Sequence, residues 1–246
     1  MPGPAELSVV PGMLGGVLAG VLDVFLPQSC VGCGGVGARC CAGCAAGMAA
    51  APARRGPQPS PPGLPECWSA APYEGAARAA ILAYKERGAV GLAGVLAQVL
   101  AFTVLTALGA AAGAGAGWAR GPFAVVPVPS AKRALRARGH DPMGRVAVLV
   151  ARHLVACGVR AEPWAALRQV RRVSDQAGLS STQRAANLAG SLRVAGRVKG
   201  PPAPSALLLD DVLTTGASLT EAARALRAAG LRVPMAATVA ATRRRS

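Results

Sequence analysis

The stretch ALLLDDVLTTGASLT, residues 206–220, constrains the fold of this chain more than any other part of it. Its first four residues, 206–209, are apolar and predict a buried strand, and a helix is expected from Ser218 onward. Asp210 and Asp211 follow the strand directly, where two adjacent acids are a poor choice for packing. Ligands of open α/β sheets bind at the carboxyl ends of strands. The stretch therefore predicts an α/β fold with a ligand site at the end of this strand.

The residues after the two acids have the composition of a phosphate-binding turn. Gly216 allows the backbone to approach a ligand closely, and backbone N–H groups in front of a helix can hold an anion. Read as ordinary helix caps, Asp and Ser would explain one hydroxyl group but neither the paired acids nor the Thr-Thr-Gly run. The residues expected to bind phosphate are Thr214, Thr215, Gly216, Ala217 and Ser218.

Predicted helices and strands alternate along the chain from residue 68 onward. The predicted helices span 74–87, 89–108, about 143–156 and 218–229, and the predicted strands span 123–128, 206–209 and 233–241. Such alternation is typical of a parallel sheet that is covered by helices on both faces.

Composition divides the chain into three parts. Residues 49–67 are rich in Pro, Ala and Arg, a composition typical of a linker. They separate an amino-terminal part with a helix and a cysteine module, residues 1–48, from the predicted α/β domain, residues 68–246.

Two apolar stretches raise the question of a membrane or a secretory signal. Residues 7–26 have no basic flank and are interrupted by Asp23, which does not fit a signal peptide. Residues 89–117 carry no charge and are long enough to span a bilayer, but most of them are Ala and Gly. We interpret them as a core helix followed by a flexible loop, GAAAGAGAG, at 109–117. We expect a cytoplasmic protein without a membrane span.

Five of the seven cysteines lie between residues 30 and 44. Cys30 with Cys33, and Cys41 with Cys44, form two C-x-x-C units, and two such units can complete a tetrahedral Zn²⁺ site. A redox pair or unused thiols are the alternatives. Cys40 stands beside Cys41 and could be the ligand in its place. Four thiolates leave no coordination position open, which favours a structural role for the metal.

Positive charge dominates the composition. The chain has 27 Lys and Arg against 11 Asp and Glu, a net charge of +16, which favours an anionic partner such as a phosphorylated metabolite, nucleic acid or a membrane surface. Nearly all of this charge is arginine in a chain rich in Ala, Gly and Pro, so compositional bias explains it equally well. The chain has three Phe, two Tyr and three Trp, and aromatic residues do not interleave the positive charge as a surface for stacking bases would need.

Taken together, these motifs resemble the ComF family, the competence-associated proteins with a type I phosphoribosyltransferase-like domain. LLLDDVLTTGAS is similar to the phosphoribosyl-diphosphate motif of type I phosphoribosyltransferases. The cysteine pairs are similar to the zinc module of the ComF family. Three further parts of the chain are similar to family segments: 73–75 with 81–88, 126–141, and 176–188.

The resemblance implies a fold and a set of roles. The fold would be a parallel sheet with flanking helices and a small hood, preceded by the zinc module. Asp210 and Asp211 would contact the ribose 2′- and 3′-hydroxyl groups, the turn Thr214–Ser218 would hold the 5-phosphate, and Mg²⁺ would bridge diphosphate and ribose oxygens. The cations expected to neutralise the diphosphate or close the site are Lys132, Arg133, Arg138 and, in the hood, Arg184.

Three functions agree with this resemblance. The first is an enzyme that transfers ribose 5-phosphate to an unidentified acceptor. The second is a non-catalytic module of DNA uptake that binds phosphoribosyl diphosphate or single-stranded DNA beside a helicase-like partner. The third is a salvage phosphoribosyltransferase for purines or pyrimidines, and the cysteine module argues against it.

Overall fold

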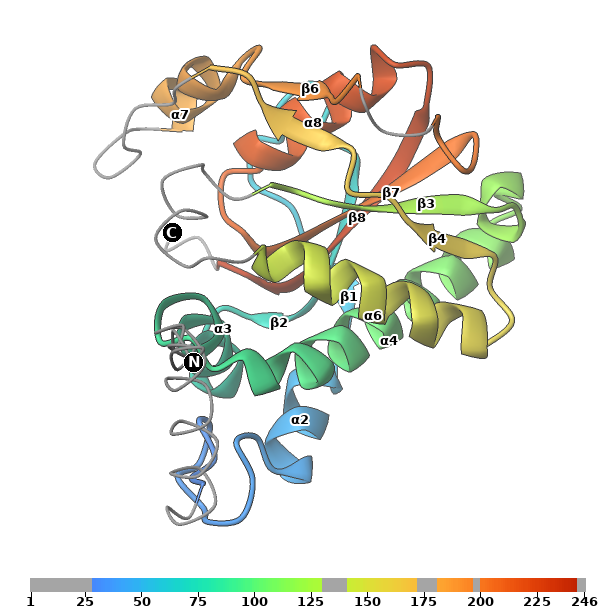
Figure 1. The fold of residues 1–246 in the computed structure, drawn as a ribbon. Helices are drawn as coiled ribbons and strands as arrows, with labels where there is room; N and C mark the ends of the chain where they lie inside the picture. The colour runs from blue at the N-terminus through green and yellow to red at the C-terminus, as the bar shows by residue number, and fades with distance from the viewer. Residues whose placement is uncertain (1–27, 130–140, 172–180, 197–199, 243–246) are drawn as a thin grey trace, which may run out of the picture.

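The computed structural model describes residues 28–129, 141–171, 181–196 and 200–242. A six-stranded sheet with the order β1-β2-β8-β7-β3-β4 forms its centre (Figure 1). Neighbouring strands are parallel except for β1, which is antiparallel to β2. In chain order the strands are β1 Ala53–Arg54, β2 Glu66–Pro72, β3 Phe123–Pro127, β4 Ala161–Pro163, β7 Ser205–Leu213 and β8 Arg232–Ala241. The predicted α/β fold with a mostly parallel sheet is confirmed.

Helices flank the sheet on both faces. On one face lie α3 (Gly75–Glu86), α4 (Ala93–Gly113) and α6 (Pro142–Ala156). On the other face lie α8 (Ala217–Arg227), α7 (Ser181–Leu188) and a two-stranded ribbon of β5 (Leu167–Gln169) and β6 (Leu192–Val194). Figure 1 shows the first group below the sheet and the second above it.

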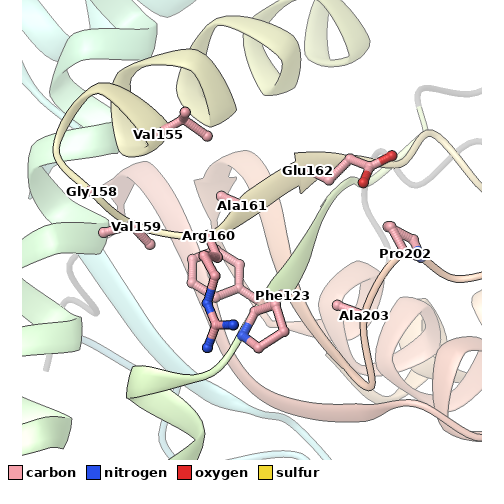
Figure 2. Close-up of a pocket in the computed structure, with 10 residues that line it drawn as sticks. Phe123, Val155, Gly158, Val159, Arg160, Ala161, Glu162, Pro202 and Ala203 are labelled. Atoms are coloured by element: carbon pink, nitrogen blue, oxygen red, sulfur yellow. The ribbon is translucent and has the colours of Figure 1, made fainter.

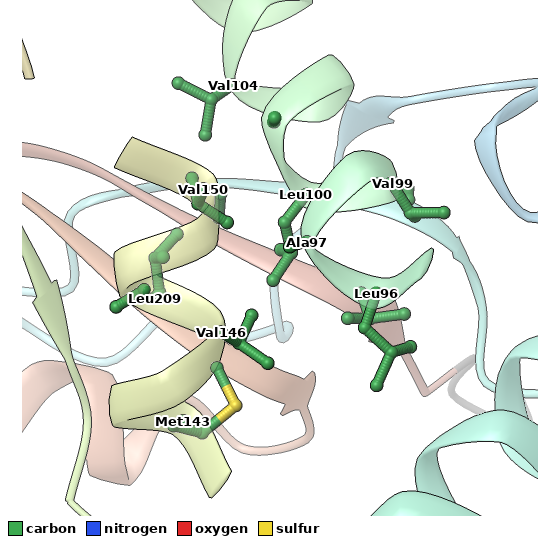
Figure 3. Packing of buried hydrophobic residues seen from close by; sticks show 14 of the residues in the cluster. Leu96, Ala97, Val99, Leu100, Val104, Met143, Val146, Val150 and Leu209 are labelled. Carbon is green, nitrogen blue, oxygen red and sulfur yellow. The ribbon is translucent and has the colours of Figure 1, made fainter. Parts of the chain in front are cut away.

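The larger hydrophobic core fills the space between the sheet and the α4–α6 layer. Figure 3 shows Leu100 of α4, Val146 and Val150 of α6 and Leu209 of β7 gathered in one cluster. All four side chains are almost completely buried. Leu209 is the residue directly before Asp210, so burial in this core anchors the strand at the point where the acidic pair begins.

Strand β7 is longer than the sequence predicts. It continues past residue 209 to Leu213, because β8 pairs with it along the whole length, up to Leu213 opposite Ala241. The two acids therefore lie within the strand rather than after it. Helices α3, α6 and α8 and strands β3 and β8 begin and end within two residues of their predicted positions.

The apolar helix α4 is a core helix over much of its length. Among the described residues, Val90–Gly113 is the one helical segment long and apolar enough to cross a membrane, and 56% of its most apolar stretch is buried. The expectation of a loop from residue 109 is wrong up to Gly113, because alanines favour the helix and continue it. Two 3₁₀ turns, Val90–Leu92 and Gly117–Arg120, flank it.

The amino-terminal cysteine module, residues 28–49, packs against the α3–α4 side of the sheet. It consists of a cysteine-bearing loop and helix α2 (Ala42–Ala49), which contacts both α3 and α4. The segment predicted as a linker contributes strand β1 to the sheet edge and the first residues of β2. The apolar stretch 7–26 lies outside the described residues.

Candidate active site and metal centre

The acidic pair lies where β7 extends past its neighbour β3. Pairing with β3 ends at Leu209, which lies opposite Pro127 and accepts a hydrogen bond from the N–H of Val128 at 2.8 Å. From Asp210 onward the described ladder continues on one side only, with β8. This is the carboxyl edge of a parallel sheet, the edge at which ligands of such sheets bind.

Asp211 points toward the α3 side of the sheet and is 7% exposed. Its Oδ2 atom forms an ion pair with Nζ of Lys85, which lies near the end of α3. A buried carboxylate requires such a partner, because an unpaired charge away from water is strongly disfavoured. Lys85 is therefore part of the site, although the sequence pattern gave it no role there.

Asp210 is partly exposed and is folded back onto the backbone. Its Oδ1 atom accepts a hydrogen bond from the N–H of Asp211 at 2.9 Å. Burial, and then the negative charge of Asp211, raise the pKa of Asp210 well above its ordinary value, and Lys85 offsets only part of this. Asp210 is partly exposed as a whole residue, and a cation or a hydroxyl donor beside its carboxyl group would favour the ionised form.

Buried hydroxyl groups lie beside Asp210 in the sheet. Thr238 of β8 is its neighbour in register, and Ser69 of β2 is the next residue across. The two hydroxyl oxygens are 2.6 Å apart, and Thr238 Oγ1 also donates to the carbonyl oxygen of Ala240 at 3.1 Å. This polar row was not predicted, because isolated Ser and Thr residues in strands carry no distinguishing pattern.

The predicted phosphate-binding turn joins β7 to α8, and the structure places all five of its residues together. Gly216 caps the helix with a φ of 75°, the left-handed region that favours glycine. Its carbonyl oxygen accepts the first helical hydrogen bond, from Thr220 N–H at 2.8 Å. Thr214 is exposed, and Thr215 and Ser218 are partly exposed. Hydroxyl groups and the N–H groups of the first turn of α8, which have no acceptor within the helix, thus lie at one point; the N–H of Ala217 donates to Thr215 Oγ1 at 3.5 Å.

A buried acid on α8 holds the β5–β6 ribbon in place. Glu221 is 4% exposed and accepts hydrogen bonds from Leu192 N–H at 2.9 Å and from Arg224 Nε at 2.7 Å. Burial acts to raise the pKa of Glu221, but the hydrogen bonds from Arg224 and from the backbone of Leu192 and Gly190 outweigh it, so the pKa is lowered. Arg224 also donates to the carbonyl oxygen of Leu192 at 3.0 Å.

Of the predicted cations, the structure places one. Arg184 lies on α7, and its buried Nε atom has no hydrogen-bond partner within the described part of the chain. Arg171 ties the end of α7 to the ribbon by donating to the carbonyl oxygens of Asn187 and Ala189, both at 2.7 Å. Lys132, Arg133 and Arg138 lie outside the described residues.

The cysteine module brings four thiols together as predicted. The sulfur atoms of Cys30, Cys33, Cys41 and Cys44 all lie within 4.8 Å of one another, and those of Cys33 and Cys41 are 3.7 Å apart. A tetrahedral site with Zn–S bonds of about 2.3 Å separates its sulfur atoms by about 3.8 Å. The group can therefore hold a metal ion such as zinc.

Backbone geometry supports this arrangement. N–H groups of Cys41, Cys33 and Gly32 point at the Cys30 sulfur and lower the pKa of that thiol to about 5. Cys41 caps helix α2, and its sulfur accepts a hydrogen bond from Cys44 N–H at 3.4 Å.

Cys41, and not Cys40, belongs to the group of four. Cys40 packs against the hydrophobic core, and its thiol points to the carbonyl oxygen of Cys41 at 3.8 Å. Burial, followed by the charges of nearby cysteines, raises the pKa of Cys40 to about 11, which favours the neutral thiol. The structure thus distinguishes two residues that the spacing alone left equivalent.

A hollow lies at the edge of the sheet opposite the acidic pair. It has a volume of about 370 Å³ and is lined by Phe123 at the start of β3, Ala161 at the start of β4, and Arg160, Glu162 and Ala203 (Figure 2). It lies at the amino ends of the strands, away from the acidic pair.

No protein-family model matches the sequence, and no curated protein shows significant similarity to it.

Proposed function

We propose that this chain is a phosphoribosyltransferase of the ComF type, which binds 5-phosphoribosyl diphosphate with Mg²⁺ and transfers ribose 5-phosphate to an acceptor. One observation carries the proposal. Asp210 and Asp211 lie at the open carboxyl edge of β7, and the turn Thr214–Ser218 follows them directly into the start of α8. The carboxylates that can bind sugar hydroxyl groups therefore lie at the end of the same strand that leads into the N–H donors for a phosphate.

Each part of the site has a role in this proposal. Asp210, the more exposed acid, accepts hydrogen bonds from the ribose hydroxyl groups, together with Asp211, which Lys85 holds in place. The turn binds the 5-phosphate through its backbone N–H groups and the hydroxyl groups of Thr214, Thr215 and Ser218. The β5–β6 ribbon and α7, which carries Arg184, correspond to the hood over the site.

The proposed Mg²⁺ fits the carboxylate donors at this edge, because hard oxygen ligands are those it prefers. When bound it neutralises charge on the diphosphate. Departure of diphosphate leaves a cation-like ribosyl group, so positioning and charge neutralisation are the main contributions of the protein. Asp210 contributes negative charge beside the ribose, and the hood excludes water from the reacting carbon.

We also propose that the metal of the cysteine module is Zn²⁺ with a structural role. All four positions of a tetrahedral shell are taken by thiolates, so none remains for a substrate. Zinc of this kind contributes directly to folding.

Calorimetric titration of the purified protein with phosphoribosyl diphosphate and Mg²⁺ tests the proposal. We expect binding by the wild type and by Glu162→Gln, an exposed acid at the amino end of β4. We expect no binding by the double variant Asp210→Asn/Asp211→Asn. Equal affinity in the double variant would refute the site. A wild type that binds nothing would refute the function and favour a non-catalytic role in handling DNA.

A further inference from the structure

The outer side of the phosphate-binding turn is covered by the segment that leaves the cysteine module. A Cβ atom placed on Gly216 would lie 3.0 and 3.1 Å from the two Cδ atoms of Leu64, and 3.4 Å from Cγ of Pro57. Leu64 and Pro57 therefore occupy the space that a side chain would fill at Gly216, the residue of the turn whose left-handed conformation starts α8.

The covering segment is attached at several points between the cysteines and Leu64. Within the segment, the Arg55 side chain donates to the carbonyl oxygen of Ala51 at 3.0 Å. The backbone N–H of Arg55 donates to the carbonyl oxygen of Cys67 in β2 at 2.9 Å. Strand β1 pairs with β2. Near the end of the segment, the Arg227 guanidinium of α8 donates to the carbonyl oxygen of Gly63. The chain from Cys44 to Leu64 is thus anchored to the sheet and to α8.

A second contact joins the cysteine module to α3, the helix that carries Lys85. Gly32 lies between the ligands Cys30 and Cys33, and a Cβ atom there would be 2.9 Å from Cβ of Ala76 and 2.7 Å from the Cys44 sulfur. Ala76 is in the first turn of α3, the helix that carries Lys85 and its ion pair with Asp211. The module thus contacts α3, and the segment that follows the module contacts the turn.

We infer that the metal-bound cysteine module positions the phosphate-binding turn, and that Leu64 is the positioning residue through which it acts. The inference rests on the proposed function for the identity of the ligand. Without metal, four neighbouring thiols lose the bond network that orders the loop and the start of α2. The segment that follows then loses its anchor at the cysteine module while keeping those at β2 and α8, and Leu64 confines Gly216 less tightly. The turn must then become ordered when the ligand binds, and the free energy that this ordering costs lowers the affinity for the ligand.

Amide hydrogen exchange of residues 214–220, followed by mass spectrometry on the full chain, tests the inference without any ligand. We expect exchange there to become about tenfold faster when zinc is removed by a chelator, and likewise in Leu64→Ala with zinc retained. Strand β3 is the internal reference, since it is paired on both sides, with β4 and β7. Leu105→Ala, a partly buried leucine on α4, is the matched control and leaves the turn unchanged.

Combining chelation with Leu64→Ala shows whether metal removal and the loss of the Leu64 side chain accelerate exchange of the turn through the same contact. If zinc acts through Leu64, chelation accelerates exchange of the turn less in Leu64→Ala than in the wild type. The affinity for phosphoribosyl diphosphate should fall in parallel, about tenfold in each single case. Unchanged exchange of the turn in Leu64→Ala would overturn the inference. If chelation also accelerates exchange in β3, its effect is not local to the turn. The inference is then decided by whether residues 214–220 exchange faster in Leu64→Ala than in Leu105→Ala, both with zinc retained. Absence of ligand binding by a wild type with a protected turn would instead refute the proposed function.

Discussion

Lys85 Nζ and Asp211 Oδ2 form an ion pair between the last turn of α3 and the carboxyl edge of β7. The pair joins α3, which lies on the α4 side of the sheet, to the strand that carries the two acids. It also separates the roles of the two acids, because Asp211 has a permanent partner within the protein and Asp210 lacks such an ion pair in the described part of the chain.

Removing Lys85 should leave a buried carboxylate without its counter-charge. Lys85→Met is expected to destabilise the fold by about 2 kcal/mol, less than the roughly 3–5 kcal/mol for a fully buried pair, since Lys85 retains some exposure. Urea denaturation measures this. Lys85→Met/Asp211→Asn is the control, since it removes both charges and should recover part of the loss. If the double variant were no more stable than Lys85→Met, the ion pair would not be the cause.

Asp210 is expected to reduce the stability of the ligand-free protein. An acid with a raised pKa holds its proton more tightly in the folded than in the unfolded state, so stability falls as the pH rises above its unfolded value, about 3.9. Asp210→Asn should therefore stabilise the fold by about 1 kcal/mol at neutral pH and by almost nothing in strong acid. Denaturation curves at pH 7 and pH 3.5 test this, and an equal gain at both would contradict the assigned cause.

Much of this fold could be predicted from local sequence, and the part that could not depends on contacts between distant segments. The helix α6 and the strands β3 and β8 follow directly from apolar patterns. Strand β2 has the sequence ECWSAAP, in which Ser, Ala and Pro give no signal of a strand. The strand forms because its residues pair with β8 in the sheet. The turn Thr214–Ser218 was predicted because its residues are consecutive. Lys85 and Leu64 were not, because only the folded chain brings them to the site.

Glu221 should make stability depend on acid pH in the opposite direction to Asp210. Its pKa is lowered in the folded state, so its contribution is present above the ordinary glutamate value of about 4.3 and is lost as the pH falls through the folded value. Glu221→Gln is expected to lose about 2 kcal/mol at pH 7. The difference in stability between the variant and the wild type should become smaller below pH 4, as measured by thermal unfolding at pH 7 and below pH 4. A gap independent of pH would mean that packing, not charge, accounts for the loss.

Metal analysis of cysteine variants should separate Cys41 from its neighbour Cys40. The purified protein is expected to contain zinc at about one ion per chain, as a four-thiolate site holds. Cys41→Ser should lose most of the metal, and Cys40→Ser should retain it with a small loss of stability from packing. Elemental analysis after gel filtration gives the ratio. Retention by Cys41→Ser with loss in Cys40→Ser would reverse the assignment.

A side chain at Gly216 should destabilise the turn, for two separable reasons. Its φ of 75° disfavours any residue with a Cβ atom by about 1 kcal/mol, and a Cβ atom would also meet Leu64 at 3.0 Å. Gly216→Ala should therefore weaken binding of phosphoribosyl diphosphate and lower the melting temperature. Shortening the neighbour, in Gly216→Ala/Leu64→Ala, removes the steric part only, so the double variant should be more stable than the sum of the two single losses predicts. Strict additivity would show that the two residues do not press on each other, and the contact between the module's segment and the turn would then carry no energy.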